Sequence, residues 1–305
     1  MEIIDDGLRF SGPVGIVKAK LHRPIVRTIK TVTITMTPSG RYFASVLSKQ
    51  QAEKPSPSTE GKVAGIDLGL KNFAIVHDGF KTSKHHNPKH LARHEGNLAR
   101  KQGKLARKQK GSNSRDKARK LVARVHERVS NVRQDYLHKL SRKLVDNNQV
   151  MVVESLHLLD MVKNHKLAKA ISDVGLGMFV NFVAYNLEKE GKVLVEIDRW
   201  FPTSKLCCNC HDQVDEMPLD VREWTCSSCG TRHDRDGNAA INIRAEGMRM
   251  LLVSGTGTAT HGKEVRPMRG RKSEVKALPC EVRSLCYTRS GLASGTSPFS
   301  TPNFI

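Results

Sequence analysis

Hydrophobic and polar residues alternate with a period of two near the start of the chain. Residues 14–20, 30–36 and 41–47 each place apolar side chains at every second position, and a Pro-Ser-Gly sequence separates the last two runs. Period two, β-branched residues and a turn between runs predict three antiparallel strands. Because three strands bury little surface by themselves, we expect a β-rich segment over residues 1–50 that packs on something else.

A second region mixes apolar strands with helices, and a polar, proline-containing linker at 51–62 precedes it. The run at 149–154 is almost continuously apolar, which is typical of a strand buried on both faces. The predicted elements are strands at 63–70, 73–79, 149–154 and 191–197 and helices at 173–190 and 236–246. Strands followed by helices in this way predict an α/β fold.

A long basic stretch separates the strands of this region. Residues 89–143 hold 18 Lys or Arg against four acids, and Gly111-Ser112-Asn113 divides the stretch into two helices. In the second helix, apolar residues recur at i+3 and i+4 steps: Val122, Val125, Val129, Val132, Tyr136, Leu140 and Leu144. This spacing predicts one buried stripe and an opposite basic face. A charge run is often only a solvated face, but here we expect contact with nucleic-acid phosphates.

Composition narrows the class of protein. The 305 residues suggest about two domains, and the net charge of +21 favours a polyanionic partner, most simply nucleic acid. No run of about 18 apolar residues occurs and residues 1–6 are acidic, so we expect no membrane span and no secretory signal. Aromatic residues make up 5%, so a surface built on base stacking is not the leading expectation. Residues 248–305 lack periodicity and predict a mostly disordered basic tail.

Four of the seven cysteines form two CxxC pairs. Fifteen residues separate the first pair, Cys207 and Cys210, from the second pair, Cys226 and Cys229. This spacing predicts a zinc ribbon in which four thiolates close one tetrahedral structural Zn²⁺ site. Three cysteines remain spare, and two nearby histidines are not needed as ligands: Cys208, Cys280, Cys286, His211 and His233.

Three acids occupy unusual places in the predicted elements. Asp67 interrupts an apolar strand, Glu154 ends another, and Asp236 opens a helix after the cysteines. A buried acid is costly unless it is paired or bound to a metal, so each is either a hydrogen-bonded structural acid, an N-cap or a metal ligand. Three of them in one α/β unit favour ligation of Mg²⁺ or Mn²⁺, which take carboxylate oxygens. Separations of more than 80 residues mean that only the fold can bring them together.

The motifs follow one another in an order that resembles a known family. They are Gly65-Ile66-Asp67-Leu68-Gly69, Val152-Val153-Glu154, the 164–173 motif, Arg199-Trp200-Phe201-Pro202-Thr203-Ser204-Lys205, the cysteine pairs, and Asp234-Arg235-Asp236-x-Asn238-Ala239-Ala240-x-Asn242-Ile243. The chain resembles the OrfB/TnpB family encoded by insertion sequences, relatives of single-effector CRISPR nucleases. The resemblance covers roughly residues 8–247. Family members begin with a further strand and a helical recognition lobe, so we expect an N-terminally truncated copy.

The resemblance implies a RuvC-like nuclease core on an RNase H-like fold, with a helical insertion, an inserted zinc ribbon and an N-terminal wedge-type β segment. It implies an RNA-guided DNA endonuclease whose guide RNA comes from the transposon end, acting in the cytoplasm at the nucleoid, with a separate transposase in the same element. Asp67, Glu154 and Asp236 correspond to the catalytic acids that hold Mg²⁺ or Mn²⁺, with Asp67 between two ions, and Asp234 is the second choice for the third acid. The implied division is a core at 63–202 with a basic helical insertion at 85–147, a ribbon at 203–233 and a last core helix at 234–247.

Two alternatives remain open at this point. A nucleic-acid-binding protein without cleavage, such as a truncated copy or repressor, would use the basic helices and the ribbon but would not need three buried carboxylates. A junction resolvase or another guide-free RuvC-like nuclease would share the core, but the ribbon before the last acid disfavours it. Nothing in the sequence supports a strand-transferring transposase acting alone.

Overall fold

The computed structural model of the chain describes residues 2–4, 7–10, 12–13, 15–21, 28–49, 55–218, 220–255 and 284–286. The chain divides into two compact units. One consists of Met1–Gln51 with Arg271–Ile305, and the other is Ala52–Gly270. All seven candidate metal ligands belong to the second unit.

The first unit contains two small antiparallel sheets. Leu8 and Ala44 are buried in its apolar cluster. One sheet joins β1 (Glu2–Ile4), β2 (Gly7–Arg9) and β3 (Ile16–Lys18); the other joins β4 (Ile29–Met36), β5 (Tyr42–Ser48) and β13 (Ser284–Cys286). The β-rich N-terminal segment is confirmed, and the three predicted strands correspond to β3, β4 and β5, although β3 belongs to a different sheet from β4 and β5. The first predicted strand pairs with β2 because periodicity identifies a strand without specifying its partner.

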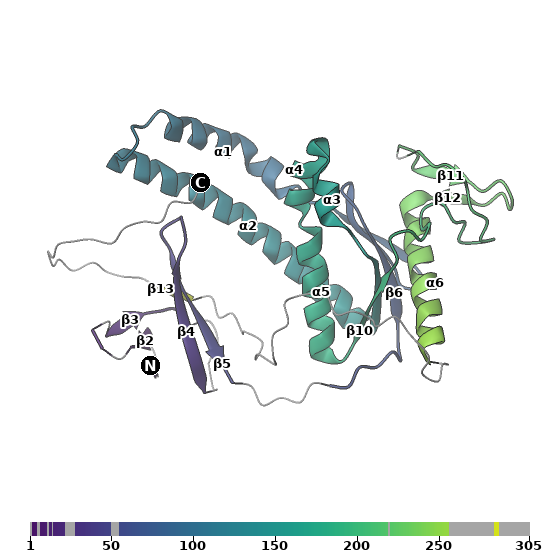
Figure 1. Cartoon of the computed structure of the whole chain (residues 1–305), viewed down its shortest axis with the longest axis horizontal. Helices are drawn as coiled ribbons and strands as arrows, with labels where there is room; N and C mark the ends of the chain where they lie inside the picture. The colour runs from purple at the N-terminus through teal and green to yellow at the C-terminus, as the bar shows by residue number, and fades with distance from the viewer. Residues whose placement is uncertain are drawn as a thin grey trace. The chain divides into compact units, whose positions relative to one another are not determined.

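The second unit is built on a five-stranded mixed sheet of order β10-β9-β6-β7-β8 (Figure 1). Its strands are β6 (Val63–Leu68), β7 (Asn72–His77), β8 (Thr82–His86), β9 (Val150–Glu154) and β10 (Val193–Ile197). Strand β7 is antiparallel to both of its neighbours, β6 and β8, whereas β9 and β10 run parallel to β6 on its other side. This order and these directions are those of an RNase H-like sheet, so the predicted fold class is confirmed.

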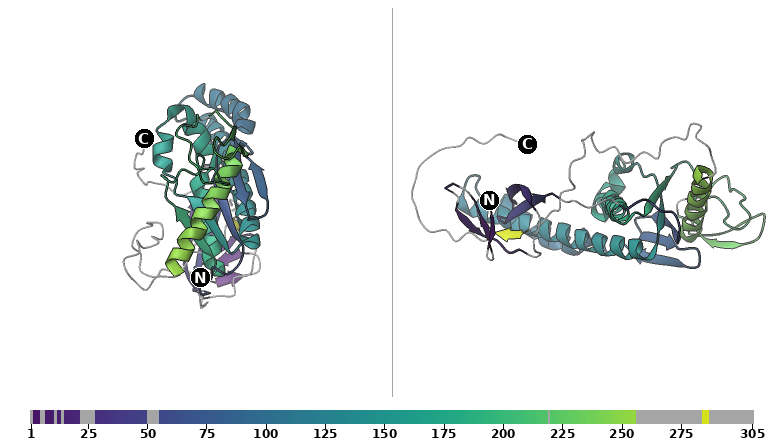
Figure 2. Two further views of the ribbon diagram at one scale, coloured as in Figure 1. Left: turned by 90° about the vertical axis from the view of Figure 1, so that its right-hand side faces the viewer. Right: turned by 90° about the horizontal axis from the view of Figure 1, so that it is seen from below.

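Helices cover both faces of this sheet. On one face, α2 (Asn113–Asn147) and α5 (Leu176–Glu190) bury a cluster in which the Phe73 and Phe179 rings meet edge to face at 5.0 Å. On the other face, α6 (Arg235–Gly255) packs Ile243 against Val150 and Val152. Figures 1 and 2 show α6 on the side of the sheet away from α5. Strand β9 is therefore buried on both faces, as its sequence predicted.

The basic stretch forms two helices, α1 (His90–Ala106) and α2, as expected. The Ser112 hydroxyl caps α2 by accepting a hydrogen bond from the backbone N–H of Arg115 at 3.2 Å. The predicted stripe on α2 was wrong at Val132, which is 39% exposed. The buried side turns instead through position 133, where Arg133 forms a 2.9 Å ion pair with Asp173, and then through Leu137.

Helix boundaries differ from the predictions at two places. Gly175 adopts a left-handed φ of 73°, which ends α4 (His165–Val174), so the helix predicted over 173–190 begins only at Leu176. A short α3 (Leu158–Val162) precedes α4. Helix α6 continues to Gly255, so the tail prediction was wrong for 248–255, and β13 occupies 284–286. The rest of the predicted tail lies outside the described residues.

One stretch, Leu167–Glu190, is long and apolar enough by composition to span a membrane. It includes the break at Gly175, and in α5 its apolar residues Phe179, Val183 and Leu187 are buried against the sheet and α2. Core helices pass the same composition test, so the stretch gives little support for a membrane span.

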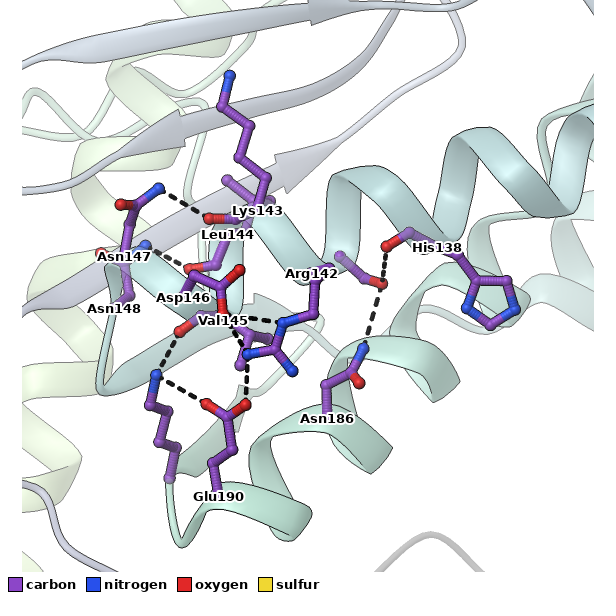
Figure 3. Close-up of polar contacts among 12 residues, drawn as sticks. His138, Arg142, Lys143, Leu144, Val145, Asp146, Asn147, Asn148, Asn186 and Glu190 are labelled. Atoms are coloured by element: carbon purple, nitrogen blue, oxygen red, sulfur yellow. Dashed lines mark hydrogen bonds and ion pairs between the residues drawn. The ribbon is translucent and has the colours of Figure 1, made fainter. Parts of the chain in front are cut away.

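Polar contacts fix α2 against α5 at the end of the sheet (Figure 3). Arg142 pairs with Asp146 on its own helix and with Glu190 on α5, and Lys192 pairs with the same glutamate at 3.1 Å. Lys192 Nζ also donates to the backbone carbonyl of Val145 at 2.5 Å. These bonds hold the end of α2, from which β9 starts toward the candidate site.

Candidate carboxylate and cysteine sites

The first two acids lie at the carboxyl ends of neighbouring parallel strands. The register of β6 and β9 pairs Ile66 with Val153, so Asp67 and Glu154 are the next residues on the two strands. Alternation along each strand places both acids on the α6 face, because Gly65 and Val152, two residues earlier, meet α6. In α/β sheets this strand end is where ligands bind.

Helix α6 brings the third acid to the same end of the sheet. It lies very close to β6, because a Cβ on Gly65 would come within 2.3 Å of the Ala240 carbonyl oxygen. Gly247 of α6 allows the same close packing against β9, because a Cβ added there would lie 2.4 Å from a methyl group of Val152. With its middle held over Gly65, the helix presents Asp236 in its first turn toward the strand ends.

The protonation of Asp67 depends on its burial and on the two other acids. Burial, and then the negative charges of Glu154 and Asp236, raise the pKa of Asp67 from 3.8 to about 7. Arg235 and Arg222 oppose this shift. Within the described part of the chain, the Asp67 carboxylate has no hydrogen bond or ion pair. The carboxylate is thus desolvated, faces like charges and lacks a direct partner.

Glu154 is held by the segment that follows β10. The Thr203 hydroxyl donates a 2.6 Å hydrogen bond to Glu154 Oε1. Burial raises the pKa of Glu154, while this hydrogen bond acts in the opposite direction. One carboxylate oxygen is therefore oriented by Thr203.

Asp236 and Asp234 have different surroundings. Arg222, from the ribbon, forms a 3.3 Å ion pair with Asp236, whose side chain is 23% exposed. Asp234 caps α6 by accepting a 2.8 Å hydrogen bond from the Gly237 backbone N–H, and it pairs with Lys84 of β8 at 2.8 Å. Since Asp234 is engaged as a structural cap, the geometry favours Asp236 over Asp234 as the third acid of the site.

These donors fit a hard divalent cation. Mg²⁺ and Mn²⁺ prefer carboxylate oxygens, and a cation would neutralise the unpaired Asp67 carboxylate and its negative neighbours. The three carboxylates are less tightly grouped than the cysteine sulfurs, however. Among the described residues, the four cysteines form a group of three or more possible ligands that lie within 4.8 Å of one another, and the three carboxylates do not form such a group. The assignment of the three acids as ligands stays a prediction.

The four cysteines predicted for the ribbon do come together. Cys207, Cys210, Cys226 and Cys229 have sulfur atoms within 4.8 Å of one another and could hold a metal ion. The Cys210–Cys226 and Cys207–Cys229 sulfur distances are 3.5 and 3.7 Å. Hydrogen bonds with the Thr231 hydroxyl and backbone lower the pKa of Cys229 to about 5, which favours the thiolate form that metals bind.

Two backbone turns of the same design carry these cysteines. In one, the N–H of His211 donates to the carbonyl of Cys207 at 2.9 Å; in the other, the N–H of Gly230 donates to Cys226 at 2.9 Å. The two donors share a left-handed backbone, with φ of 63° at His211 and 71° at Gly230. The strands β11 (Glu223–Thr225) and β12 (Arg232–Asp234) pair on either side of the second turn. His211 thus occupies a position that favours glycine, outside the sulfur cluster.

The remaining cysteines and histidine have other places. His233 is buried, with Nε2 3.1 Å from Cys207 Sγ and Nδ1 3.8 Å from Cys208 Sγ. Cys208 stands beside the cluster without belonging to it. Cys286 is part of β13 in the first unit, and Cys280 lies outside the described residues.

Two asparagines of α6 connect the ribbon to the core, and their roles were not identified from the sequence. Asn242 Nδ2 donates to the carbonyls of Thr203 and Leu206 at 2.8 and 2.7 Å. Asn238 donates to Leu206 at 2.7 Å and accepts a 3.0 Å bond from the Cys208 backbone. Their i, i+4 spacing was visible, but their partners were not. Arg222 was also missed, because it is one of 51 basic residues with no motif around it.

Comparisons with known proteins match these regions. Residues 45–165 match OrfB_IS605, a family described as "Probable transposase", and residues 177–243 match the "Cas12f1-like, TNB domain". A Streptomyces pristinaespiralis protein named "Putative RNA-guided DNA endonuclease" is 44% identical over 82% of this chain and 60% of its own length. A Mycobacterium tuberculosis protein, "Putative RNA-guided DNA endonuclease Rv2885c", is 31% identical over 70% of this chain and 48% of its own.

A cryo-EM structure of a CRISPR-Cas12f ternary complex aligns at 13% identity with a TM-score of 0.49, over 75% of this chain and 45% of that one. The chain spans about half to three fifths of the length of the two curated relatives described above. The family matches cover the strands of the core, the ribbon and the first part of α6, in the order that the motifs predicted. The chain belongs to the OrfB/TnpB family, with an OrfB_IS605 region followed by a Cas12f1-like TNB domain.

Proposed function

We propose that this chain is a transposon-encoded RNA-guided DNA endonuclease that hydrolyses phosphodiester bonds at Asp67, Glu154 and Asp236. The observation that carries the proposal is the state of Asp67, a partly buried carboxylate that has no hydrogen bond or ion pair within the described residues and lies beside Glu154 and Asp236 at one end of the sheet. The names of the curated relatives support the same activity. A purely binding protein would have no need for this arrangement.

The three carboxylates would hold Mg²⁺ or Mn²⁺, which when bound activate water and stabilise the leaving oxygen of a phosphodiester. Thr203 keeps one oxygen of Glu154 oriented through its 2.6 Å hydrogen bond. Arg222 supplies positive charge beside Asp236, where a phosphate would also be attracted. The N-terminal end of α6 adds a favourable field for Asp236.

Binding of nucleic acid would use the basic helices α1 and α2. Their side chains would contact backbone phosphates and would give an affinity that falls with salt. In this proposal base pairing with a guide RNA from the transposon end selects the DNA, and the chain contacts the shape of the duplex. A separate transposase of the same element and a cytoplasmic, nucleoid-associated location complete the proposal.

The ribbon would serve as a structural part of this enzyme. Four thiolates leave no open position for catalysis, so Zn²⁺ at the cysteine cluster would hold the two turns together. Arg222 lies between the two cysteine pairs, so the fold of the ribbon sets its approach to Asp236. The predicted division into core, insertion, ribbon and last helix is proposed with the boundaries given above.

The test is cleavage of DNA by the full chain with its guide RNA and Mg²⁺. We expect cutting by the unchanged protein and none by Asp67→Ala, with equal binding of RNA and DNA by both. Equal cutting by the two proteins would reject the carboxylate site. Salt-dependent binding without any cutting by either would favour the alternative of a binding protein.

A further inference from the structure

The segment that follows β10 lies directly beside Glu154. Ile197, the last residue of β10, pairs with Glu154 in the sheet, and the Ser155 N–H donates to the Ile197 carbonyl at 3.1 Å. Six residues later, Thr203 donates its hydrogen bond to Glu154. Trp200 is midway between these two contacts, three residues from each. Its backbone is therefore within about 11 Å of both contacting residues.

The two aromatic residues of this segment have opposite surroundings. Phe201 is partly buried and packs with Ile197 and Ile243 in the cluster under α6. Trp200 is 77% exposed, and the guanidinium of Arg199 lies 4.6 Å from its ring centroid. The side chain of Asp198 fixes the turn by accepting a 2.9 Å hydrogen bond from the Trp200 backbone N–H. Trp200 thus leaves a large ring in solvent on a segment that is anchored on both sides.

The anchors make this exposure unusual. Asn242 holds the Thr203 carbonyl from α6, and Thr203 holds Glu154, so the segment cannot easily fold its tryptophan inward. The other tryptophan, Trp224, packs on His233 at 4.7 Å within the ribbon. An exposed tryptophan with a stacked arginine offers an apolar face and a positive charge at one place, which suits a base with its phosphate.

We propose that Trp200 and Arg199 form a stacking platform for an unpaired nucleobase of single-stranded DNA that enters the carboxylate site. The platform deepens the proposed function and rests on it for the identity of the strand. Stacking on an aromatic ring tolerates any base, because every base has a π-face. The backbone of Trp200 lies within about 11 Å of Thr203, which contacts Glu154. A DNA strand whose base stacks on Trp200 would therefore place a neighbouring phosphate near the acids. The low aromatic content of the chain is consistent with one platform instead of an extended stacking surface.

The experiment uses the full chain without added Mg²⁺, so that binding is measured without cleavage. A Trp224→Phe variant leaves Trp200 as the source of tryptophan fluorescence. We expect oligothymidylate to quench this fluorescence to saturation, while an abasic oligonucleotide of the same length and charge does not. By anisotropy of a labelled oligothymidylate, Trp200→Ala should weaken binding about five-fold or more.

Phe80→Ala provides the matched control. Phe80 is 90% exposed between β7 and β8, at the end of the sheet opposite the acids, and its loss should leave the affinity unchanged. Unchanged affinity in Trp200→Ala, or equal quenching by the abasic strand, would overturn the platform. If a protein ligand occupies Trp200 instead, oligothymidylate will not quench, which rejects the proposal as well. Guided cleavage is measured separately: cutting without quenching rejects only the platform, whereas quenching without cutting rejects the nuclease.

Discussion

The cysteine cluster and the carboxylate site reach their geometry by opposite routes. The four sulfur atoms come from two short turns of one local module, and they lie within 4.8 Å of one another. The three carboxylates come from two parallel strands and a helix, and they are brought to one end of the sheet only when the core has folded. The first site is therefore specified by local spacing, and the second by the whole core.

The two sites also differ in how the chain balances their charge. Around Cys229, hydrogen bonds with Thr231 favour the thiolate that a metal would bind. Around Asp67, burial and two negative neighbours disfavour the carboxylate. Cys210 of the cysteine cluster behaves differently from Cys229, because its hydrogen bond with the Asp212 backbone lowers its pKa while burial and the neighbouring sulfurs raise it to about 12. Because the ionised Asp67 carboxylate is destabilised in the metal-free protein, a divalent cation that binds there would offset its charge and that of its neighbours.

The largest loss of stability should come from removing a ligand of the cysteine cluster. Cys226→Ser removes a buried sulfur ligand, and structural zinc contributes on the order of 10 kcal/mol to the fold of such modules. We expect purified Cys226→Ser to lose its bound zinc, as measured by elemental analysis, while the core keeps its helical signal. Cys208→Ser is the matched control and should keep one zinc per chain. Loss of zinc from Cys208→Ser would show that the ligand set is different.

The second prediction concerns the charge on Asp67. Because its folded pKa of about 7 exceeds its unfolded value of 3.8, the free energy of unfolding of the metal-free protein should fall as pH rises from about 4 to 7. Asp67→Asn should abolish this fall and stabilise the metal-free protein by up to roughly 4 kcal/mol above pH 7. Urea unfolding at a series of pH values measures both effects. Parallel pH profiles for the two proteins would contradict the prediction.

The contrast between the sites explains what could be predicted from sequence. The CxxC pairs were sufficient for the cysteine cluster, since their ligands are neighbours along the chain. Their places in the predicted elements singled out Asp67, Glu154 and Asp236, and the resemblance implied their catalytic role. The fold was needed to show that β6, β9 and α6 bring them to one end. The ion pair of Arg222 and the exposure of Trp200 depend on tertiary contacts that leave no periodic signal. The same holds for Arg133, whose ion pair with Asp173 replaced an expected apolar contact on α2.

The third prediction tests the connection between the two sites. Asn242→Ala removes the buried amide that binds the Thr203 and Leu206 carbonyls, which leaves both without this partner. We expect a loss of about 2–3 kcal/mol in the free energy of unfolding of the core. Zinc content should stay unchanged, since no sulfur ligand is touched. If Asn242→Ala released zinc as readily as Cys226→Ser, the ribbon would not be the local module described here.

The smallest change in stability should come from replacing His211 with glycine. Its left-handed backbone costs about 1 kcal/mol for a residue with a side chain, and Gly230 meets the same need in the other turn. We expect His211→Gly to keep the zinc and to raise the concentration of chelator needed to remove half of it by several-fold. A loss of zinc in His211→Gly would instead make the imidazole a ligand.

The central claim is that Asp67, Glu154 and Asp236 bind divalent ions together, and a titration with Mn²⁺ followed by electron paramagnetic resonance tests it most directly. Zinc-loaded unchanged protein should bind Mn²⁺, and each of Asp67→Asn, Glu154→Gln and Asp236→Asn should weaken that binding at least ten-fold, whereas Asp234→Asn should weaken it less. If the three substitutions leave the Mn²⁺ affinity unchanged, the three acids do not form one metal site.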